Sequence, residues 1–180
     1  RAALHRRVGE HDSARQAFLR AAERATLGDR EDLLLEAALS YVDEGDDPMA
    51  VTALGQLLES VDDPVVLDHA QLFHAHARLR LGEDDARRTI RQVADGGGPA
   101  AVTALVGLAE LYEDEGRPEE ARHLYERWRD HAPADPEPLR RIAQVLLGAG
   151  RAAEAMDAAK AALDAGGPDQ MEPTLLVMGE

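Results

Sequence analysis

Glycine and alanine recur in register along this chain, and their spacing constrains the fold more than any other feature of the sequence. Five glycines follow one another at intervals of 34 to 37 residues, and an alanine stands seven residues before each of them. A second alanine follows each glycine by four or five residues. The glycines are Gly9, Gly45, Gly82, Gly116 and Gly150, the preceding alanines Ala2, Ala38, Ala75, Ala109 and Ala143, and the following alanines Ala14, Ala50, Ala86, Ala121 and Ala155. A period of roughly 20 to 50 residues is typical of repeat proteins, so we expect stacked units.

Within each unit the spacing is that of α-helices. A larger side chain comes four residues after the second alanine in most units, as Phe18, Leu54, Ile90 and Tyr125 do, and steps of four and three residues mark one helical face. Prolines close four of the units, where a residue without an N–H suits a helix boundary. We expect first helices at about 30–44, 65–81, 100–115 and 137–149, and second helices at about 12–25, 48–60, 84–94, 119–131 and 152–165.

The pattern resembles the tetratricopeptide repeat most clearly in the second half of the chain. A large residue is followed there by a small one, an aromatic, a turn glycine, a small residue, an aromatic and a proline. These residues are Leu108, Ala109, Tyr112, Gly116, Ala121, Tyr125 and Pro133, and the next copy has Ile142, Ala143, Leu146, Gly150, Ala155 and Ala159. Upstream copies are looser: Arg78 replaces the first-helix aromatic. In the clearest copy, Trp128 fills a place usually held by a small residue. The resemblance implies an all-α, right-handed α-α superhelical solenoid of antiparallel helix pairs.

That fold makes residues 1–180 a single repeat domain of about five repeats, and it gives the two small residue types a purpose. Alanine on both partners lets helix axes approach to the close end of the usual range of about 8–10 Å, and glycine can end the first helix with a positive φ. The units are expected at about 1–29, 30–63, 64–99, 100–134 and 135–168, with a partial unit at 169–180. Because the chain opens without methionine and closes in an apolar run, we expect a fragment of a longer protein, or self-association through exposed repeat ends.

Charge and composition exclude several classes of function. The net charge of -15 repels nucleic acid and anionic membranes, and no apolar run reaches the roughly 20 residues that span a bilayer. The chain has no cysteine and shows no set of nucleophile, base and orienting residue. We therefore expect a cytoplasmic protein that is not an enzyme and needs no cofactor. Lys160 is the only lysine and asparagine is absent, which is typical of a GC-rich, bacterial genome.

In the family that the chain resembles, first helices line a concave surface on the side turned away from the packing alanines. The resemblance implies a lining that is aliphatic and histidine-bearing in one half and acidic in the other. Such a lining suits an amphipathic or extended segment with aliphatic anchors and a few basic residues. The residues expected to line this groove are Leu35, Leu39, Val42, His69, Leu72, His76, Arg80, Val106, Glu110, Glu113, Arg140 and Gln144. The alternative is that some of these leucines only pack against adjacent helices.

Three histidines close together invite a metal hypothesis, which helical geometry disfavours. His69 and His76 would lie two turns apart, roughly 10 Å along the axis, and His74 would point away from His76. A pH-responsive pair and ordinary packing histidines remain the alternatives. Most of the carboxylates that gather at the turns are expected to cap helices, since acidic residues at helix starts interact well with the helix dipole. Trp128 and Tyr125 are expected in the core between repeats.

These features predict a non-catalytic scaffold or adaptor that binds a protein or peptide segment in a concave groove. The alternative is a regulatory or sensor segment of a larger bacterial signalling or transcription protein, in which the repeats pass a binding event to an effector domain. The presence of a nucleotide-binding or DNA-binding domain in the same gene would favour the alternative. The sequence does not identify the partner.

Overall fold

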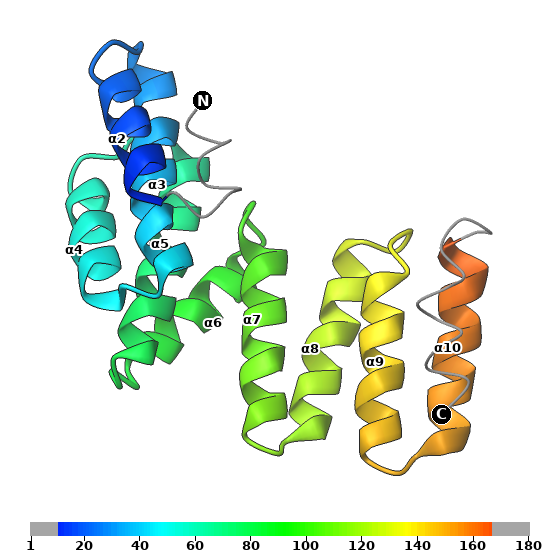
Figure 1. Cartoon of the computed structure of the whole chain (residues 1–180). Helices are drawn as coiled ribbons and strands as arrows, with labels where there is room; N and C mark the ends of the chain where they lie inside the picture. The colour runs from blue at the N-terminus through cyan, green and yellow to red at the C-terminus, as the bar shows by residue number, and fades with distance from the viewer. Residues whose placement is uncertain (1–10, 167–180) are drawn as a thin grey trace. The chain divides into compact units, whose positions relative to one another are not determined.

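The computed structural model describes residues 11–166, apart from the side chains of residues 27 and 28, and within this part all regular structure is α-helical (Figure 1). Contacts divide the chain into two compact units, residues 1–101 and 102–180, next to the predicted boundary at 99/100. The helices of unit 1 are α2 (His11–Ala22), α3 (Leu27–Glu44), α4 (Asp47–Leu58), α5 (Pro64–Arg80) and α6 (Ala86–Gly96). Those of unit 2 are α7 (Ala101–Asp114), α8 (Pro118–His131), α9 (Glu137–Gly148) and α10 (Ala152–Gly166). Each agrees with its predicted helix to within a few residues.

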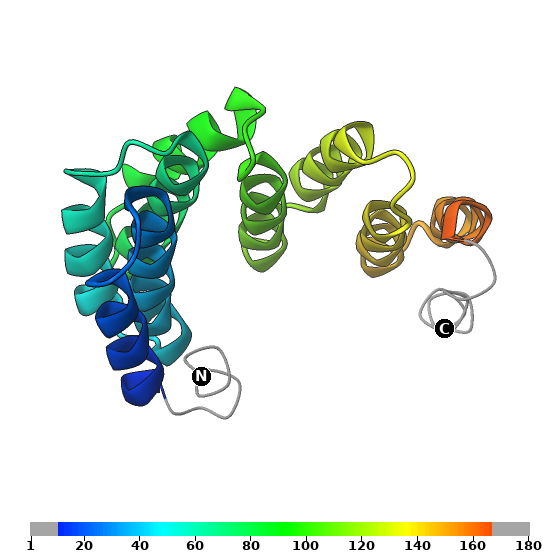
Figure 2. The same ribbon diagram turned by 90° about the horizontal axis from the view of Figure 1, so that it is seen from above.

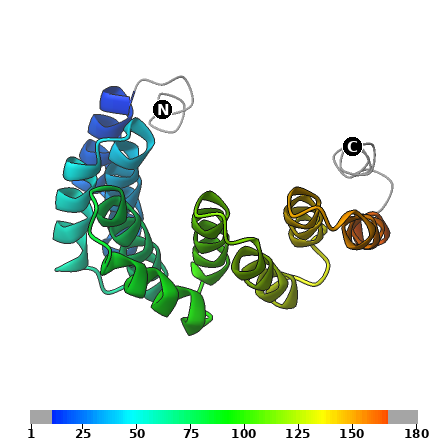
Figure 3. The ribbon, with the colours of Figure 1, turned by 90° about the horizontal axis from the view of Figure 1, so that it is seen from below.

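Neighbouring helices within a unit pack side by side. In unit 1, α3 packs against α2, α4 and α5, and α5 also packs against α4 and α6 (Figure 2). In unit 2, α9 packs against both α8 and α10 (Figure 3). The predicted first unit and the partial unit at 169–180 extend outside the described residues, as do Ala2, Gly9 and the apolar end of the chain.

The turn glycines behave as their spacing predicts. Gly45 has φ 74° and ends α3; its N–H donates to the carbonyl of Val42, and the N–H of Asp46 donates to that of Tyr41. This pair of bonds is the Schellman motif, which needs a left-handed residue that glycine adopts without strain. The same two bonds recur after α5, α7 and α9, where the glycines also have positive φ. One local device therefore ends every first helix in the described part of the chain.

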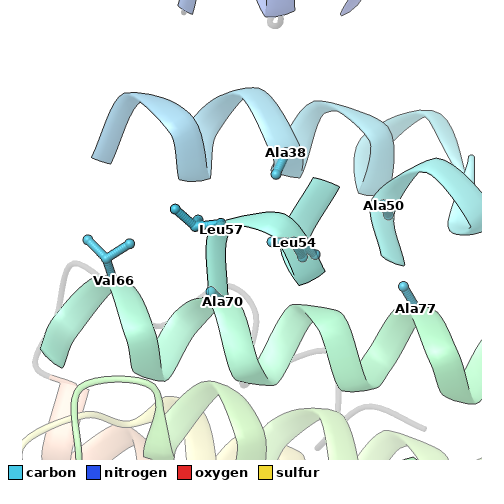
Figure 4. Packing of buried hydrophobic residues seen from close by; sticks show 7 residues of the cluster. All are labelled: Ala38, Ala50, Leu54, Leu57, Val66, Ala70 and Ala77. Atoms are coloured by element: carbon cyan, nitrogen blue, oxygen red, sulfur yellow. The ribbon is translucent and has the colours of Figure 1, made fainter. Parts of the chain in front are cut away.

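Both alanine columns are buried. Among the described residues, Ala38, Ala75, Ala109 and Ala143 expose 3% or less, and Ala14, Ala50, Ala86, Ala121 and Ala155 expose 2% or less. Figure 4 shows how they pack in unit 1: Ala38 of α3 and Ala50 of α4 join Leu54, Leu57 and three residues of α5 in one core cluster. The alanines of both columns therefore lie in the interior of each unit and not at its surface.

Two carboxylates in unit 1 bind backbone N–H groups that lie about one repeat further along the chain. Glu31 of α3 accepts hydrogen bonds from the N–H groups of Asp62 and Asp63, at 3.1 and 2.9 Å. Asp68 of α5 accepts from the N–H of Ala100 at 2.9 Å. A Cβ at Gly98 would lie 2.5 Å from the Asp68 carboxylate, so glycine allows this close approach. Glu31 and Asp68 each stand fourteen residues before a turn glycine, a column that the sequence analysis did not identify.

The turn carboxylates have two roles rather than one. Asp46 accepts a hydrogen bond from the N–H of Met49, and Asp63 accepts from those of Val65 and Val66, so the capping prediction is confirmed at α4 and α5. Capping is wrong for Asp85, whose side chain makes no cap bond at α6. Asp85 and Glu83 instead form ion pairs with Arg78. Arg78 occupies the place of an aromatic residue, and its guanidinium attracts these carboxylates.

Aromatic residues take part in the core of unit 2. Tyr125 is fully buried and Trp128 is 9% exposed, with ring centroids 6.3 Å apart and planes inclined by 50°. The Tyr125 hydroxyl donates to Glu113 of α7 at 2.6 Å. Burial and this hydrogen bond raise the pKa of Tyr125. The expectation that Tyr125 and Trp128 belong to the core is therefore confirmed.

Candidate functional site

Two surfaces are candidates for binding, and the first is the predicted one. We call the predicted groove residues on α3 and α5 the first-helix face of unit 1: Leu35, Leu39, Val42, His69, Leu72, His76 and Arg80. Because α3 packs against α5, the structure brings these residues onto neighbouring helices. Leu35 and Val42 are partly buried against the core cluster, and Leu39 is partly exposed without belonging to that cluster. All three are partly exposed, and Leu39 is the one that does not pack against the core cluster.

Three other residues of the first-helix face are already engaged by the fold. Leu72 has no exposed surface, so its side chain packs in the interior, as the alternative in the sequence analysis allowed. The Arg80 guanidinium forms an ion pair with Asp47 of α4, with Nε 2.7 Å from Oδ1. His69 Nδ1 lies 2.8 Å from the carbonyl oxygen of Val65, one turn earlier in α5. The burial of Leu72 and the ion pair of Arg80 hold α5 against its neighbours, and all three contacts leave a smaller free surface than the sequence predicts.

The other two histidines of α5, His74 and His76, have lowered pKa values, which favour their neutral forms. Burial, with the nearby charge of Arg80, lowers the pKa of His76 to about 4. Burial and the charge of Arg78 also lower the pKa of His74, whose ring lies against Gly55 of α4. Within residues 11–166, no group of three or more His, Cys, Asp or Glu side chains could hold a metal ion.

The predicted groove residues of unit 2 make polar contacts within that unit. Glu110 of α7 accepts from Arg141 of α9 at 3.3 Å, and Glu113 accepts from Tyr125, as described above. Arg140 pairs with Glu137 on its own helix. Val106 is partly buried, and Gln144 is exposed. Most of the polar residues predicted to contact a partner here therefore already contact neighbouring side chains.

The second candidate surface lies in unit 1 and was missed by the sequence analysis. It is a pocket of about 370 Å³ between α2 and α4, with α3 as its floor, and we call it the second-helix recess. Its lining residues are Arg15 and Leu19 of α2, Leu34, Ala37, Ala38 and Tyr41 of α3, and Met49, Thr52, Ala53, Gln56, Leu57 and Ser60 in and after α4. The signal that could have revealed it is the α4 set, which repeats at helical spacing and contains no charged residue.

A buried arginine closes one end of the recess. Arg15 is only 9% exposed, and its Nη1 donates to the Ser40 hydroxyl at 3.1 Å and to Glu44 at 3.2 Å. It also forms an ion pair with Asp12, and its guanidinium carbon lies 3.8 Å from the ring centroid of Tyr41. Burial opposes the charged form, but the hydrogen bond to Glu44 and the surrounding negative charges outweigh it and raise the pKa of Arg15. The guanidinium is thus fixed and neutralised by its partners.

None of the helices in the described part of the chain combines the length and the apolar character that a bilayer crossing requires.

Comparisons with known proteins identify the fold. Residues 102–145 match the family model described as Tetratricopeptide repeat. The chain is also similar to the crystal structure of MamA, with 20% identity over 91% of this chain and 93% of that one and a TM-score of 0.61. Residues 102–145 thus have the sequence pattern of a tetratricopeptide repeat, and the chain has the fold of tetratricopeptide-repeat proteins. No curated protein matches its sequence significantly.

Two further structures of tetratricopeptide-repeat proteins agree with the described fold. YrrB, described as a TPR protein with an unusual peptide-binding site, is 13% identical over 99% of this chain and 89% of its own, with a TM-score of 0.61. A putative kinesin light chain of Podospora anserina with nearly identical TPR-like repeats is 18% identical over 94% and 93%, with a TM-score of 0.65. At these identities the likeness shows the fold alone, and it confirms the predicted all-α solenoid of helix pairs.

The tetratricopeptide-repeat match and the second-helix recess fall in different units. Unit 2 contains the matched residues 102–145, with the aromatic residues Tyr112 and Tyr125 at their expected places. Unit 1 contains the recess and keeps the same helix pairs with a core of alanine and aliphatic residues. The repeat fold therefore extends beyond the region in which the family sequence pattern is strong.

Proposed function

We propose that this tetratricopeptide-repeat chain is a non-catalytic scaffold that binds a peptide or protein segment on the first-helix face of unit 1. The observation that supports the proposal is the partly exposed row of Leu35, Leu39 and Val42 on α3, beside His69 on the adjacent α5. Aliphatic side chains at steps of four and three residues form one helical stripe, the surface into which a partner inserts apolar anchors. The peptide-binding site named for YrrB supports the same use of the fold.

The proposal is tested by a substitution that blocks the first-helix face without disturbing the core. Leu39→Arg places a long cation on a partly exposed residue of α3 that does not belong to the core cluster. The matched control is Leu81→Arg, at a leucine that follows α5 and is 46% exposed. Both variants are first checked for wild-type helicity by circular dichroism.

Each purified protein is then used for affinity capture from a lysate of the organism that encodes it, with quantitative mass spectrometry of the captured proteins. We expect Leu39→Arg to capture at least about tenfold less of each partner than the wild type does, because a central apolar anchor has been removed. Leu81→Arg should capture the same amounts as the wild type. Equal recovery of the same partners by all three proteins would show that the first-helix face does not bind them.

A further inference from the structure

The second-helix recess has the dimensions and the lining of a binding site. Its volume of about 370 Å³ falls within the range of roughly 300–1,000 Å³ that is usual for ligand pockets. Its two walls carry two of the four large apolar side chains that are exposed among the described residues, Leu19 at 43% and Met49 at 42%. Unpartnered apolar surface on both sides of one hollow is the arrangement that a bound apolar group would cover.

The α4 wall is shaped for an elongated occupant. Met49, Thr52, Ala53, Gln56 and Leu57 occupy one face of α4, and Ser60 continues that face just beyond the end of the helix. At about 1.5 Å per residue this row is roughly 16 Å long, the length of about three helical turns. A guest helix would lie along this row with apolar residues, at steps of three and four, against Met49, Ala53 and Leu57.

The charges around the recess favour a basic occupant over a second copy of this chain. The recess lining contains one charged residue, Arg15, which is already paired with Asp12 and Glu44. Asp46 stands at the same end, where its carboxylate caps the turn that holds Met49. Among the described residues named here, three carboxylates face one cation at this end, and the whole chain carries a net charge of -15. A second copy of the chain would be repelled, and a segment with basic flanks would be attracted.

We propose that the second-helix recess docks an amphipathic helix of a partner protein, with aliphatic side chains against α3 and α4 and a lysine or arginine beside Asp12, Glu44 and Asp46. Both surfaces use α3, but the residues that line the recess are not those of the first-helix face, so this inference does not depend on the function proposed above. The recess gives unit 1 a second docking surface, which selects partners by their basic charge as well as by their apolar helix face.

A designed peptide tests the proposal directly. The probe is a fluorescein-labelled helical peptide of about four turns, with leucine on one face and lysine elsewhere. Two further peptides serve as controls: one has glutamate in place of every lysine, and one has the same composition as the probe in scrambled order, which removes the apolar face. Binding to the whole chain is measured by fluorescence anisotropy.

Matched substitutions locate the binding site. Gln56→Arg places a cation on the α4 wall, and Gln92→Arg makes the same change on an exposed residue of α6. We expect Gln56→Arg to weaken binding of the probe by about tenfold or more and Gln92→Arg to leave it within about twofold. If Gln56→Arg loses helicity, Thr52→Arg, also exposed on α4, replaces it.

Three results would overturn the proposal: equal effects of Gln56→Arg and Gln92→Arg, binding of the glutamate peptide as tight as that of the probe, or equal binding of the scrambled peptide, which would indicate charge attraction alone. Leu39→Arg separates this inference from the proposed function. Loss of the probe in Leu39→Arg but not in Gln56→Arg would place the peptide on the first-helix face and refute docking in the recess.

Discussion

Units 1 and 2 share one repeat pattern but are held together by different interactions. In unit 1, Glu31 and Asp68 accept hydrogen bonds from backbone N–H groups about one repeat away. At the same repeat position unit 2 has Val102 and Pro136, which have no carboxylate. Ion pairs of arginine join successive helix pairs in both units, Arg80 with Asp47 in unit 1 and Arg141 with Glu110 and Arg151 with Glu119 in unit 2, so the carboxylate links to backbone are what unit 1 has in addition.

The buried cores of the two units also differ. In unit 1 the buried cluster around Leu54 consists of alanine and aliphatic side chains, and Phe18 is buried in a second cluster, while unit 2 places Tyr125 at the repeat position of Leu54 and Trp128 on the same helix. Because both units share the small-residue columns and the turn glycines, these residues define the repeat geometry. The large residues and the links between repeats can be exchanged, because many combinations fill the same space between the same helices.

Removing the aromatic core of unit 2 is expected to have the largest effect. Tyr125→Ala creates a cavity and removes the partner of Glu113, so we expect a loss of about 3–5 kcal/mol in the free energy of unfolding. Trp128 is the only tryptophan, and its fluorescence during urea unfolding reports on unit 2. The matched change in unit 1 is Leu54→Ala, followed by circular dichroism, with an expected loss at the lower end of about 2–5 kcal/mol. A larger loss for Leu54→Ala than for Tyr125→Ala would contradict the difference between the two cores.

The carboxylate link of unit 1 is expected to have the next largest effect. Glu31→Ala removes the acceptor of two backbone N–H groups, one of them partly buried, and should lower the free energy of unfolding by about 1–3 kcal/mol. The control is Asp32→Ala, the adjacent exposed carboxylate, which should change stability by less than about 0.5 kcal/mol. Both are measured by urea unfolding. Equal effects of the two substitutions would mean that the loss is one of surface charge and not of the link.

Most of the fold could be predicted from the sequence because the glycine and alanine columns act locally. A glycine with positive φ ends a helix wherever it stands, and an alanine seven residues earlier faces the neighbouring helix by helical geometry alone. The aromatic core of unit 2 could be predicted for the same reason, since Tyr125 and Trp128 lie on one helical face. The links of Glu31 and Asp68 were missed because their partners are backbone N–H groups, which leave no pattern of residue types at the receiving end.

The candidate sites were less predictable because exposure depends on how neighbouring helices are spaced. The sequence predicted that Leu39 and Leu72 both line the groove, yet Leu39 is partly exposed and Leu72 is fully buried. The second-helix recess depends on the separation of α2 and α4, which the sequence of either helix does not specify. Its uncharged α4 face was visible in the sequence, but the same pattern is typical of any buried helix face.

A pH-dependent difference is also expected between the units, because His76 is in unit 1. Its pKa is lowered from 6.5 to about 4, so below pH 6.5 the unfolded chain binds a proton that the folded chain does not. The contribution of His76 to the free energy of unfolding is therefore fully present above pH 6.5. It falls as the pH decreases toward 4, by about 1 kcal/mol at about pH 5.5. His76→Gln should reduce this loss, and His123→Gln, at a 70% exposed side chain of unit 2, should not. Urea unfolding at about pH 7.5 and about pH 5.5 measures the difference.

The ion pairs of unit 2 are expected to have the smallest effect. Arg141 is bonded to Glu110 at 3.3 Å and to Glu137 at 3.4 Å, but its side chain is 35% exposed and Glu110 is 51% exposed. Arg141→Met keeps the apolar stem and should cost less than about 0.5 kcal/mol, as measured by Trp128 fluorescence during urea unfolding. In about 1 M salt this cost should disappear, since exposed charges are screened there. Glu31→Ala should keep most of its effect in the same salt, because its carboxylate makes directed hydrogen bonds to backbone groups. If Arg141→Met destabilised the protein as much as Glu31→Ala in both conditions, the two kinds of link between repeats would be equivalent.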